Sequence, residues 1–373
     1  MNEQLEQIRL SINETDAQLT RLLAQRMDLV AKVAQIKEEA GLPVYDPKRE
    51  AAVLDKVSAL AGEEKASYLR RVYQCLMDAS KDYERVLMAP AAFPNEEEPP
   101  LPDSPKVACQ GVPGAFSGQA AQRMFPNGKI VYVPTWNDTF QKVASGECDF
   151  AVLPVENSLA GSVSQVYDLL LKYRFMINRS CRLSVEQNLL TLPEAQLEDI
   201  TEIYSHPQGL AQCKPFCDTI PHVRTIPLEN TAAAAKMVAA LGDLHKAAIA
   251  SSYCAEIYGL KVLQPNIHTD EDNATRFVAV SRQHYRSTGA NKISFVFSIL
   301  NEPGSLCQLL SGFAQIKLNL TKMELRPIAE KDFEYDFYID FSGDTDRPEV
   351  YRLIEQLKSS LPSVVYLGNY EEI

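Results

Sequence analysis

Apolar residues recur every three or four positions along the first 88 residues, which contain only two glycines. This spacing is typical of amphipathic helices. We expect a long helix over residues 2–39, a break at the sequence AGLPVYDP, and two further helices over residues 47–60 and 63–87. The pattern therefore predicts an all-α, three-helix domain over residues 1–88.

The periodicity changes further along the chain. Short apolar runs such as KVACQG, KIVYVP and DFAVLPV alternate with helix-like stretches over residues 106–285. This alternation predicts an α/β domain with a mostly parallel sheet, long enough to form two lobes with a cleft between them. Residues 290–373 follow the order strand–helix–strand–strand–helix–strand, which is the α+β ferredoxin-like (βαββαβ) arrangement. The chain is therefore expected to be multidomain.

Residues 89–105 contain six prolines and three consecutive glutamates. Such a composition cannot bury a core and predicts a semi-extended linker, so we expect each module to fold on its own. The net charge of −12 argues against nucleic acid or an anionic membrane as a partner. Neither a membrane-length apolar run nor a signal peptide is evident. The eight cysteines form no zinc spacing, so we expect reduced cysteines, a cytoplasmic location and no metal.

One charged residue interrupts an apolar seam of the first helix. Arg26 occupies the seam position between Leu22 and Leu29. A buried guanidinium without an anion costs several kcal/mol, so we expect a ligand or a carboxylate such as Asp16 or Asp46 beside it. Lys37 lies eleven residues later and shares the face of Arg26. Arg9 is about 100° away around the helix axis and would reach an equivalent pocket in a symmetric assembly.

These residues form part of a recognisable set. Asp46 and Arg49 begin the second helix, and Ser80 and Glu84 lie one turn apart on the third. With Arg9, Arg26 and Lys37, the set resembles the all-helical chorismate mutase family. The resemblance implies interlocked dimers in which Arg9 enters the partner's site. It also implies catalytic roles for Arg9, Arg26, Lys37 and Glu84, and substrate binding by Asp46, Arg49 and Ser80.

The chemistry of chorismate agrees with these residue types. Its two carboxylates suit the bidentate guanidinium fork. The rearrangement forms no covalent intermediate, so an enzyme need only hold the compact conformer and stabilise charge on the ether oxygen. Glu84 stands where some relatives place glutamine. A glutamate donates a hydrogen bond only when protonated, so we expect Glu84 in its acid form during the reaction.

In the α/β segment, polar residues gather where predicted strands end, which is where α/β proteins bind ligands. The motifs are VENS, SHPQGLAQ, LENT and NATRF, together with a glycine turn before Ser117. The simpler interpretation of LENT is a helix N-cap. The candidate substrate-binding residues are Ser117, Glu156, Asn157, Ser158, His206, Gln208, Gln212, Glu229, Thr231, Asn273, Arg276 and Phe277.

Together these motifs resemble prephenate dehydratase. The resemblance implies two lobes like those of a type II periplasmic binding protein, with the substrate between them. It implies that Thr275 is catalytic and donates to the leaving hydroxyl, and that Arg276 or amides near Ser117 hold a carboxylate. No metal or organic cofactor is required. The pattern does not separate prephenate from arogenate, which would give phenylalanine directly.

The motifs LNEPGSL and MELRP lie in the third module and resemble those with which an ACT regulatory domain binds phenylalanine. Ser305 and Leu325 depart from the usual alanine and serine, and a dimerisation domain without ligand is the simpler interpretation. The candidate effector residues are Asn301, Gly304, Ser305, Leu306 and Glu324.

The three resemblances together imply a bifunctional chorismate mutase–prephenate dehydratase. Its substrates would be chorismate and prephenate, its effector would be L-phenylalanine, and it would be a homodimer or homotetramer. Two alternatives remain open. They are a ligand-binding module of the periplasmic type, and a non-catalytic anion-binding or regulatory protein.

Overall fold

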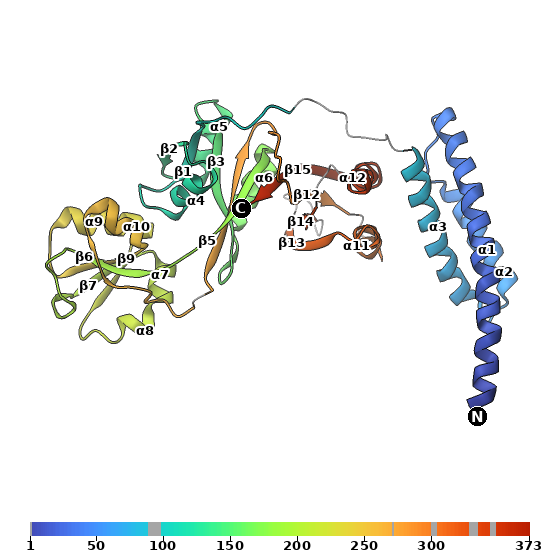
Figure 1. Ribbon diagram of the computed structural model, residues 1–373, viewed down its shortest axis with the longest axis horizontal. Helices are drawn as coiled ribbons and strands as arrows, with labels where there is room; N and C mark the ends of the chain where they lie inside the picture. Colours follow the sequence, from blue (N-terminus) through green and yellow to red (C-terminus); the bar gives the residue numbers. More distant parts are fainter. Residues whose placement is uncertain (1, 89–97, 271, 300–303, 328–334, 344–347) are drawn as a thin grey trace. The chain divides into compact units, whose positions relative to one another are not determined.

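The computed structural model describes residues 2–88, 98–270, 272–299, 304–327, 335–343 and 348–373 (Figure 1). The chain forms a helical N-terminal unit and a larger α/β unit. Within the described residues, no helix has the length and apolar character needed to span a bilayer.

The helical unit contains α1 (Asn2–Ala40), α2 (Pro47–Ala61) and α3 (Ala66–Met88). Helices α1 and α2 both pack against α3. Asp46 caps α2 by accepting a hydrogen bond from the backbone N of Arg49 at 3.0 Å, and proline occupies the first turn. The three helices agree with the prediction, although α3 begins three residues later than expected.

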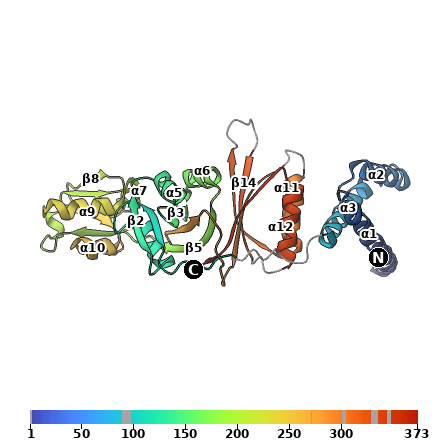
Figure 2. The same cartoon turned by 90° about the horizontal axis from the view of Figure 1, so that it is seen from above.

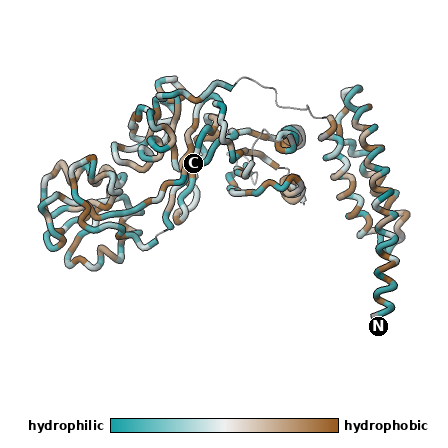
Figure 3. The backbone as a smooth tube through the Cα atoms, in the orientation of Figure 1, coloured by the Kyte–Doolittle hydropathy of each residue, from teal (hydrophilic) through white to brown (hydrophobic). Residues whose placement is uncertain are grey.

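The apolar stripe predicted for α1 is not the one that packs within the chain. Leu22 and Leu29 are 61% and 60% exposed, whereas Val30 and Ala34 are buried. At about 100° per residue, Arg26 lies between Leu22 and Leu29 on one side and Val30 and Ala34 on the other. Hydrophobic and hydrophilic residues alternate along the whole of α1 (Figure 3). The predicted seam therefore faces outward in a single chain.

The larger unit contains two α/β lobes (Figures 1 and 2). The sheet of the first lobe has the strand order β5-β11-β3-β1-β2. Its strands are β1 (Lys106–Gln110), β2 (Lys129–Val133), β3 (Phe150–Asn157), β5 (Met176–Ser184) and β11 (Ala274–Ser281), with the short β4 (Gly161–Ser162) paired to β3. Its helices are α4 (Phe116–Met124), α5 (Trp136–Ala144) and α6 (Ser164–Tyr173).

The second lobe has the strand order β10-β6-β9-β7-β8. Its strands are β6 (Asn188–Thr191), β7 (Glu202–Ser205), β8 (Arg224–Pro227), β9 (Lys246–Ala250) and β10 (Lys261–Gln264). Its helices are the short η1 (Leu197–Asp199), α7 (Pro207–Gln212), α8 (Lys214–Cys217), α9 (Thr231–Leu241) and α10 (Ser252–Tyr258).

The prediction of a mostly parallel sheet is only partly correct. Strands β1, β2 and β3 are parallel, as are β7, β8 and β9. Strand β11 is antiparallel to both β3 and β5, and β6 is antiparallel to β9 and β10. The chain passes between the lobes after β5 and returns before β11. The strands that enter each lobe, β11 and β6, run against its βαβ units, whereas β5 and β10, through which the chain leaves, run with them.

The C-terminal module contains β12 (Lys292–Ser298), α11 (Ser305–Gln315), β13 (Asn319–Pro327), β14 (Tyr335–Ser342), α12 (Pro348–Ser360) and β15 (Ser363–Glu372). This order and the strand sequence β13-β14-β12-β15 match the predicted ferredoxin-like unit. Strand β15 also pairs in parallel with β5, which joins the two modules in one ten-stranded sheet. Tyr338 and Tyr370 lie in the same core as Tyr167 and Leu170 of α6. The dehydratase and C-terminal modules therefore share one hydrophobic core.

The predicted linker is described only in its second half, since residues 89–97 lie outside the described residues. Glu98 accepts from His284 Nδ1 at 2.7 Å, and Ser104 Oγ donates to the Asn127 carbonyl at 2.9 Å. Leu101 packs against the core of the first lobe. Residues 98–105 therefore belong to that lobe.

Candidate active sites

Four of the predicted mutase residues meet where α1 packs on α3. Arg26 Nη1 donates to Ser80 Oγ, and Lys37 Nζ donates to Glu84 Oε2 at 2.7 Å and to the Val44 carbonyl at 2.7 Å. Ser80 and Glu84 are 4% and 7% exposed. Arg26 thus contacts a hydroxyl, and neither Asp16 nor Asp46 is its partner. We call Arg26, Lys37, Ser80 and Glu84 the α1–α3 row.

Three predicted mutase residues are not brought into this row by a single chain. Asp46 and Arg49 are exposed at the start of α2, where Asp46 serves as the helix cap. Arg9 has a 60% exposed side chain and pairs with Glu6 of the same helix at 2.8 Å. An exposed i,i+3 pair contributes little to stability, so Arg9 is readily available to another partner.

Glu84 accepts a hydrogen bond from the Lys37 ammonium. The acid form expected for the reaction stays a prediction for the substrate complex.

The centre of the predicted dehydratase site is a buried chain of hydrogen bonds. Asn157 Nδ2 donates to Thr275 Oγ1 at 2.9 Å and to Asn273 Oδ1 at 2.8 Å. Asn273 Nδ2 then donates to Gln212 Oε1 of α7 at 3.3 Å, so the chain reaches the second lobe. Asn157, Asn273 and Thr275 are 8%, 2% and 9% exposed. These four predicted residues therefore lie together.

The orientation of the Asn157 amide determines what Thr275 can do. Asn157 Oδ1 accepts from the backbone N atoms of Leu159 and Ala160 at 3.1 and 2.9 Å. Its NH₂ group must therefore face Thr275. Because Thr275 Oγ1 accepts this bond, its own hydrogen remains available for an acceptor in the site.

Other predicted residues have local structural contacts. Ser158 Oγ donates to the Asp272 carbonyl and accepts from the Ala274 backbone N, both at 3.0 Å. His206 caps α7 through Nδ1, and burial lowers the pKa of its imidazole. The N-cap of α9 is Asn230, which precedes Thr231. Ser117 is buried at the start of α4, Thr231 is half-buried, and Gln208 and Glu229 are exposed.

Arg276 and Phe277 make other contacts in the structure, and their substrate-binding roles stay predictions. Phe277 is 2% exposed and belongs to the core beneath α4. Arg276 is 6% exposed, forms an ion pair with Asp340 of β14, and donates to Tyr370 Oη at 2.6 Å. Burial disfavours the charged guanidinium, but Tyr370 and Asp340 hold the pKa of Arg276 above its ordinary value. A guanidinium paired in this way would have to give up these partners to bind a substrate carboxylate.

Glu156 also faces away from Thr275. Its carboxylate lies 3.2 Å from Lys322 Nζ of β13, and it is the cross-strand partner of Arg276. The role of orienting the substrate ring therefore stays a prediction for Glu156. The contacts made by Lys322 and Asp340 were not predicted, and no motif in the sequence indicates them.

The candidate effector residues are only partly described. Gly304 precedes α11 with φ of +94°, a conformation that glycine adopts without strain. Ser305 and Leu306 follow in the first turn of α11. Glu324 on β13 accepts from Ser162 Oγ at 2.7 Å. Asn301 lies outside the described residues.

The chain is similar to known proteins along its whole length. Residues 8–85 match the family chorismate mutase type II, and residues 107–285 match prephenate dehydratase. A bifunctional chorismate mutase/prephenate dehydratase of Aquifex aeolicus is 30% identical over 99% of this chain and 98% of its own. This chain belongs to the bifunctional chorismate mutase/prephenate dehydratase family.

Two further relatives resemble the dehydratase and C-terminal modules. Arogenate dehydratase 3 of Arabidopsis thaliana is 38% identical over 71% of this chain and 66% of its own. The crystal structure of prephenate dehydratase from Arthrobacter aurescens in complex with L-Phe is 29% identical, with a TM-score of 0.64. It covers 71% of this chain and 89% of its own. The two-lobed fold is thus that of a solved prephenate dehydratase.

Membership of this family assigns two consecutive reactions of phenylalanine biosynthesis to the chain. The chorismate mutase segment rearranges chorismate to prephenate, and the dehydratase segment converts prephenate to phenylpyruvate with loss of water and CO₂. The non-catalytic alternatives are therefore set aside.

Proposed function

We propose that chorismate rearranges on the α1–α3 row, with Arg49 of the same chain and Arg9 of a second chain completing the site. In this row, a guanidinium and an ammonium lie close to two buried side chains that accept hydrogen bonds. The arrangement suits a substrate with two carboxylates and an ether oxygen. Lys37 and Arg26 would exchange their present partners for the substrate.

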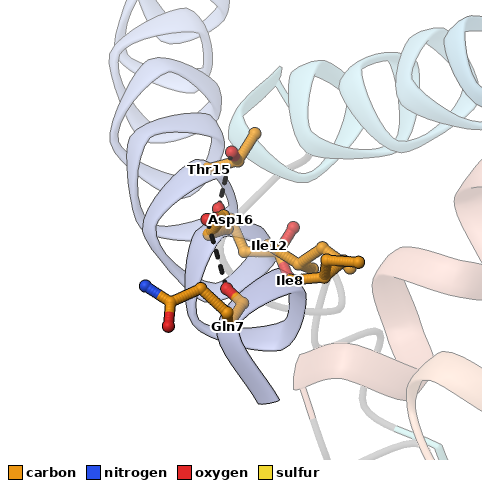
Figure 4. Close-up of a pocket in the computed structure, with 6 residues that line it drawn as sticks. Gln7, Ile8, Ile12, Thr15 and Asp16 are labelled. Carbon is orange, nitrogen blue, oxygen red and sulfur yellow. Dashed lines mark hydrogen bonds between the residues drawn. The ribbon is translucent and has the colours of Figure 1, made fainter. Parts of the chain in front are cut away.

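The second chain is proposed from the exposed surface of α1. Ile8 and Ile12 are 58% and 52% exposed, and their side chains project from the same side of α1 in Figure 4. They line a hollow on this helix together with Gln7, Ser11, Thr15 and Asp16. An exposed apolar stripe such as the one formed by Ile8 and Ile12 usually marks an interface between proteins. Pairing two α1 helices would cover the stripe and carry Arg9 to the partner's site.

The double substitution Ile8→Asp with Ile12→Asp tests this pairing. We expect the assembly to dissociate, because two carboxylates would be buried at the apolar interface. Mutase activity should then fall by roughly 100-fold, since each site loses the partner's Arg9. Sedimentation velocity and the rate of chorismate loss are the measurements. Leu60→Asp is the control, because Leu60 is also apolar but lies on α2 and is 78% exposed. This variant should change neither the sedimentation velocity nor the rate of chorismate loss.

For the dehydratase, we propose that Thr275 donates its hydroxyl hydrogen to the leaving group of prephenate. The support is the amide of Asn157, whose NH₂ group occupies a lone pair of Thr275 Oγ1 and leaves the hydrogen free. Gln212, Asn273 and Asn157 would orient the ring across the two lobes. Aromatisation supplies a strong driving force, so hydrogen bonding to the departing oxygen is sufficient assistance.

We propose that the C-terminal module is an ACT domain and that L-phenylalanine inhibits the dehydratase through it. The observation that carries this is the L-Phe complex of the similar Arthrobacter enzyme. The experiment supplies chorismate to the purified chain and follows prephenate and phenylpyruvate while L-phenylalanine is titrated. We expect phenylpyruvate formation to fall as the effector rises. An unchanged rate of phenylpyruvate formation across the titration would contradict this role of the C-terminal module.

Arogenate is a second candidate substrate, because a 38% identical relative is an arogenate dehydratase. The ratio of kcat/KM for prephenate and arogenate on the same preparation decides between them. We also propose a cytoplasmic location, since all eight cysteines are free.

A further inference from the structure

Two strands of the dehydratase carry its site residues on one face and a pair of charged residues on the other. Thr275 is the cross-strand partner of Asn157, and Arg276 is the partner of Glu156. The register shifts by one residue between Arg276 and Phe277. This bulge breaks the alternation of β3, and Glu156 and Arg276 form the cross-strand pair next to it. A displacement of Glu156 or Arg276 would therefore also move the backbone of the neighbouring residues Asn157 and Thr275.

The C-terminal module contacts both charged residues. Asp340 of β14 pairs with Arg276, and it also accepts from Ser294 Oγ at 2.5 Å. Asp340 and Ser294 are fully buried. A buried guanidinium and carboxylate paired in this way resist separation strongly, because separation would leave each charge with weaker partners. Strand β14 and strand β11 are thus firmly joined.

The contacts made by β13 are more exposed than the pair of Arg276 and Asp340. Strand β13 also carries Glu324, one of the candidate effector residues. Lys322 Nζ lies 3.2 Å from Glu156 Oε1 and donates to Ser162 Oγ at 3.0 Å. Ser162 in turn donates to Glu324 Oε2 at 2.7 Å. Ser162 is on β4, which pairs with Glu156 and Asn157 of β3. Lys322 and Glu324 therefore hold both sides of the β3–β4 hairpin next to Asn157.

We propose that Lys322 and Glu324 are positioning residues of the dehydratase: they fix the β3–β4 hairpin, and with it the hydrogen bond from Asn157 to Thr275. A ligand that engages Glu324 would draw it away from Ser162 and loosen this hydrogen bond. This regulatory step rests on the proposed function of the C-terminal module. The positioning of the hairpin does not, because its contacts exist without a ligand.

The test compares the dehydratase kinetics of Lys322→Met, Glu156→Gln and the double variant. Lys322→Met keeps the apolar stem and removes the ammonium. We expect its kcat to fall by about 5- to 10-fold with KM changed less than about twofold, because misplacement of a catalytic group affects chemistry more than binding. The double variant should be no slower than Lys322→Met, since both substitutions remove the same contact between Lys322 and Glu156.

The matched control is Asp168→Asn. Asp168 of α6 pairs with Arg326 of the same strand β13 at 2.6 Å, but it does not touch the hairpin. Its dehydratase kcat should stay within about twofold of wild type. Equal losses in Lys322→Met and Asp168→Asn, or effects of Lys322→Met and Glu156→Gln that multiply, would overturn the proposal. Ser162→Ala changes no charge and should reproduce the loss of kcat if Lys322→Met does not fold.

The regulatory step has a separate measurement. Calorimetry should show that Lys322→Met still binds L-phenylalanine, whereas the concentration for half-inhibition should rise by about tenfold or more. Half-inhibition at the wild-type concentration would overturn the coupling. If the wild-type chain binds no L-phenylalanine, the feedback proposal fails, and the kcat comparison still decides whether Lys322 positions the hairpin.

Discussion

Replacing Arg26 with alanine is expected to lower the rate of chorismate rearrangement by about 100- to 1,000-fold, because the site loses a bidentate partner of the substrate carboxylate. The dehydratase rate of the same protein should be unchanged, since its site residues lie in a different unit. The measurement is single-substrate kinetics with chorismate and with prephenate.

The variant is expected to fold. Ser80, which accepts from Arg26, also donates to the Leu76 carbonyl at 2.6 Å, so its buried hydroxyl keeps a partner. Arg21→Ala is the matched control, because Arg21 is an exposed arginine on the same helix. A mutase rate above one-tenth of wild type in Arg26→Ala would contradict the α1–α3 row as the site.

The helical unit shows how far periodicity can predict a structure. Spacing, proline and a capping aspartate were sufficient for the bounds of three helices. The face of α1 that packs on α3 was not predicted, because Leu22 and Leu29 are as apolar as Val30 and Ala34 but are exposed in the single chain. A helix with two apolar stripes can pack through either, and one chain alone does not indicate which stripe a second copy covers.

In the larger unit, strand β5 was not predicted because its central residues are polar. Asn178 and Ser180 are 1% and 0% exposed, and Asn178 Nδ2 donates to Ser281 Oγ at 2.9 Å. A buried polar pair gives no apolar alternation for a sequence pattern to detect. The link from β5 to β15, and hence the joined sheet, depends on this strand.

The residues of the dehydratase motifs lie near one another, but they face opposite sides of the sheet. Asn157, Asn273, Thr275 and Gln212 come together, whereas Glu156 and Arg276 point to the opposite face. One residue of register at the bulge decides which side chains of VENS face the substrate. A resemblance between motifs identifies the residues of a site, but it does not predict the register of the two strands that hold them.

Replacing Thr275 with alanine is expected to lower dehydratase kcat by about 100- to 1,000-fold, because the leaving hydroxyl loses its hydrogen-bond donor. Mutase activity should be unchanged. Asn157 Nδ2 would still donate to Asn273 Oδ1, so the buried amide keeps a partner and the site keeps its shape.

Two further substitutions separate the hydroxyl from the bulk of the side chain. Thr275→Ser retains the donor and should stay within about tenfold of wild type, whereas the isosteric Thr275→Val should be as slow as the alanine variant. If Thr275→Val were as active as Thr275→Ser, then volume rather than hydrogen bonding would be the contribution of Thr275. The departing oxygen would then need another donor. Asn157 is not that donor, because it already directs its own hydrogens at Asn273 and Thr275.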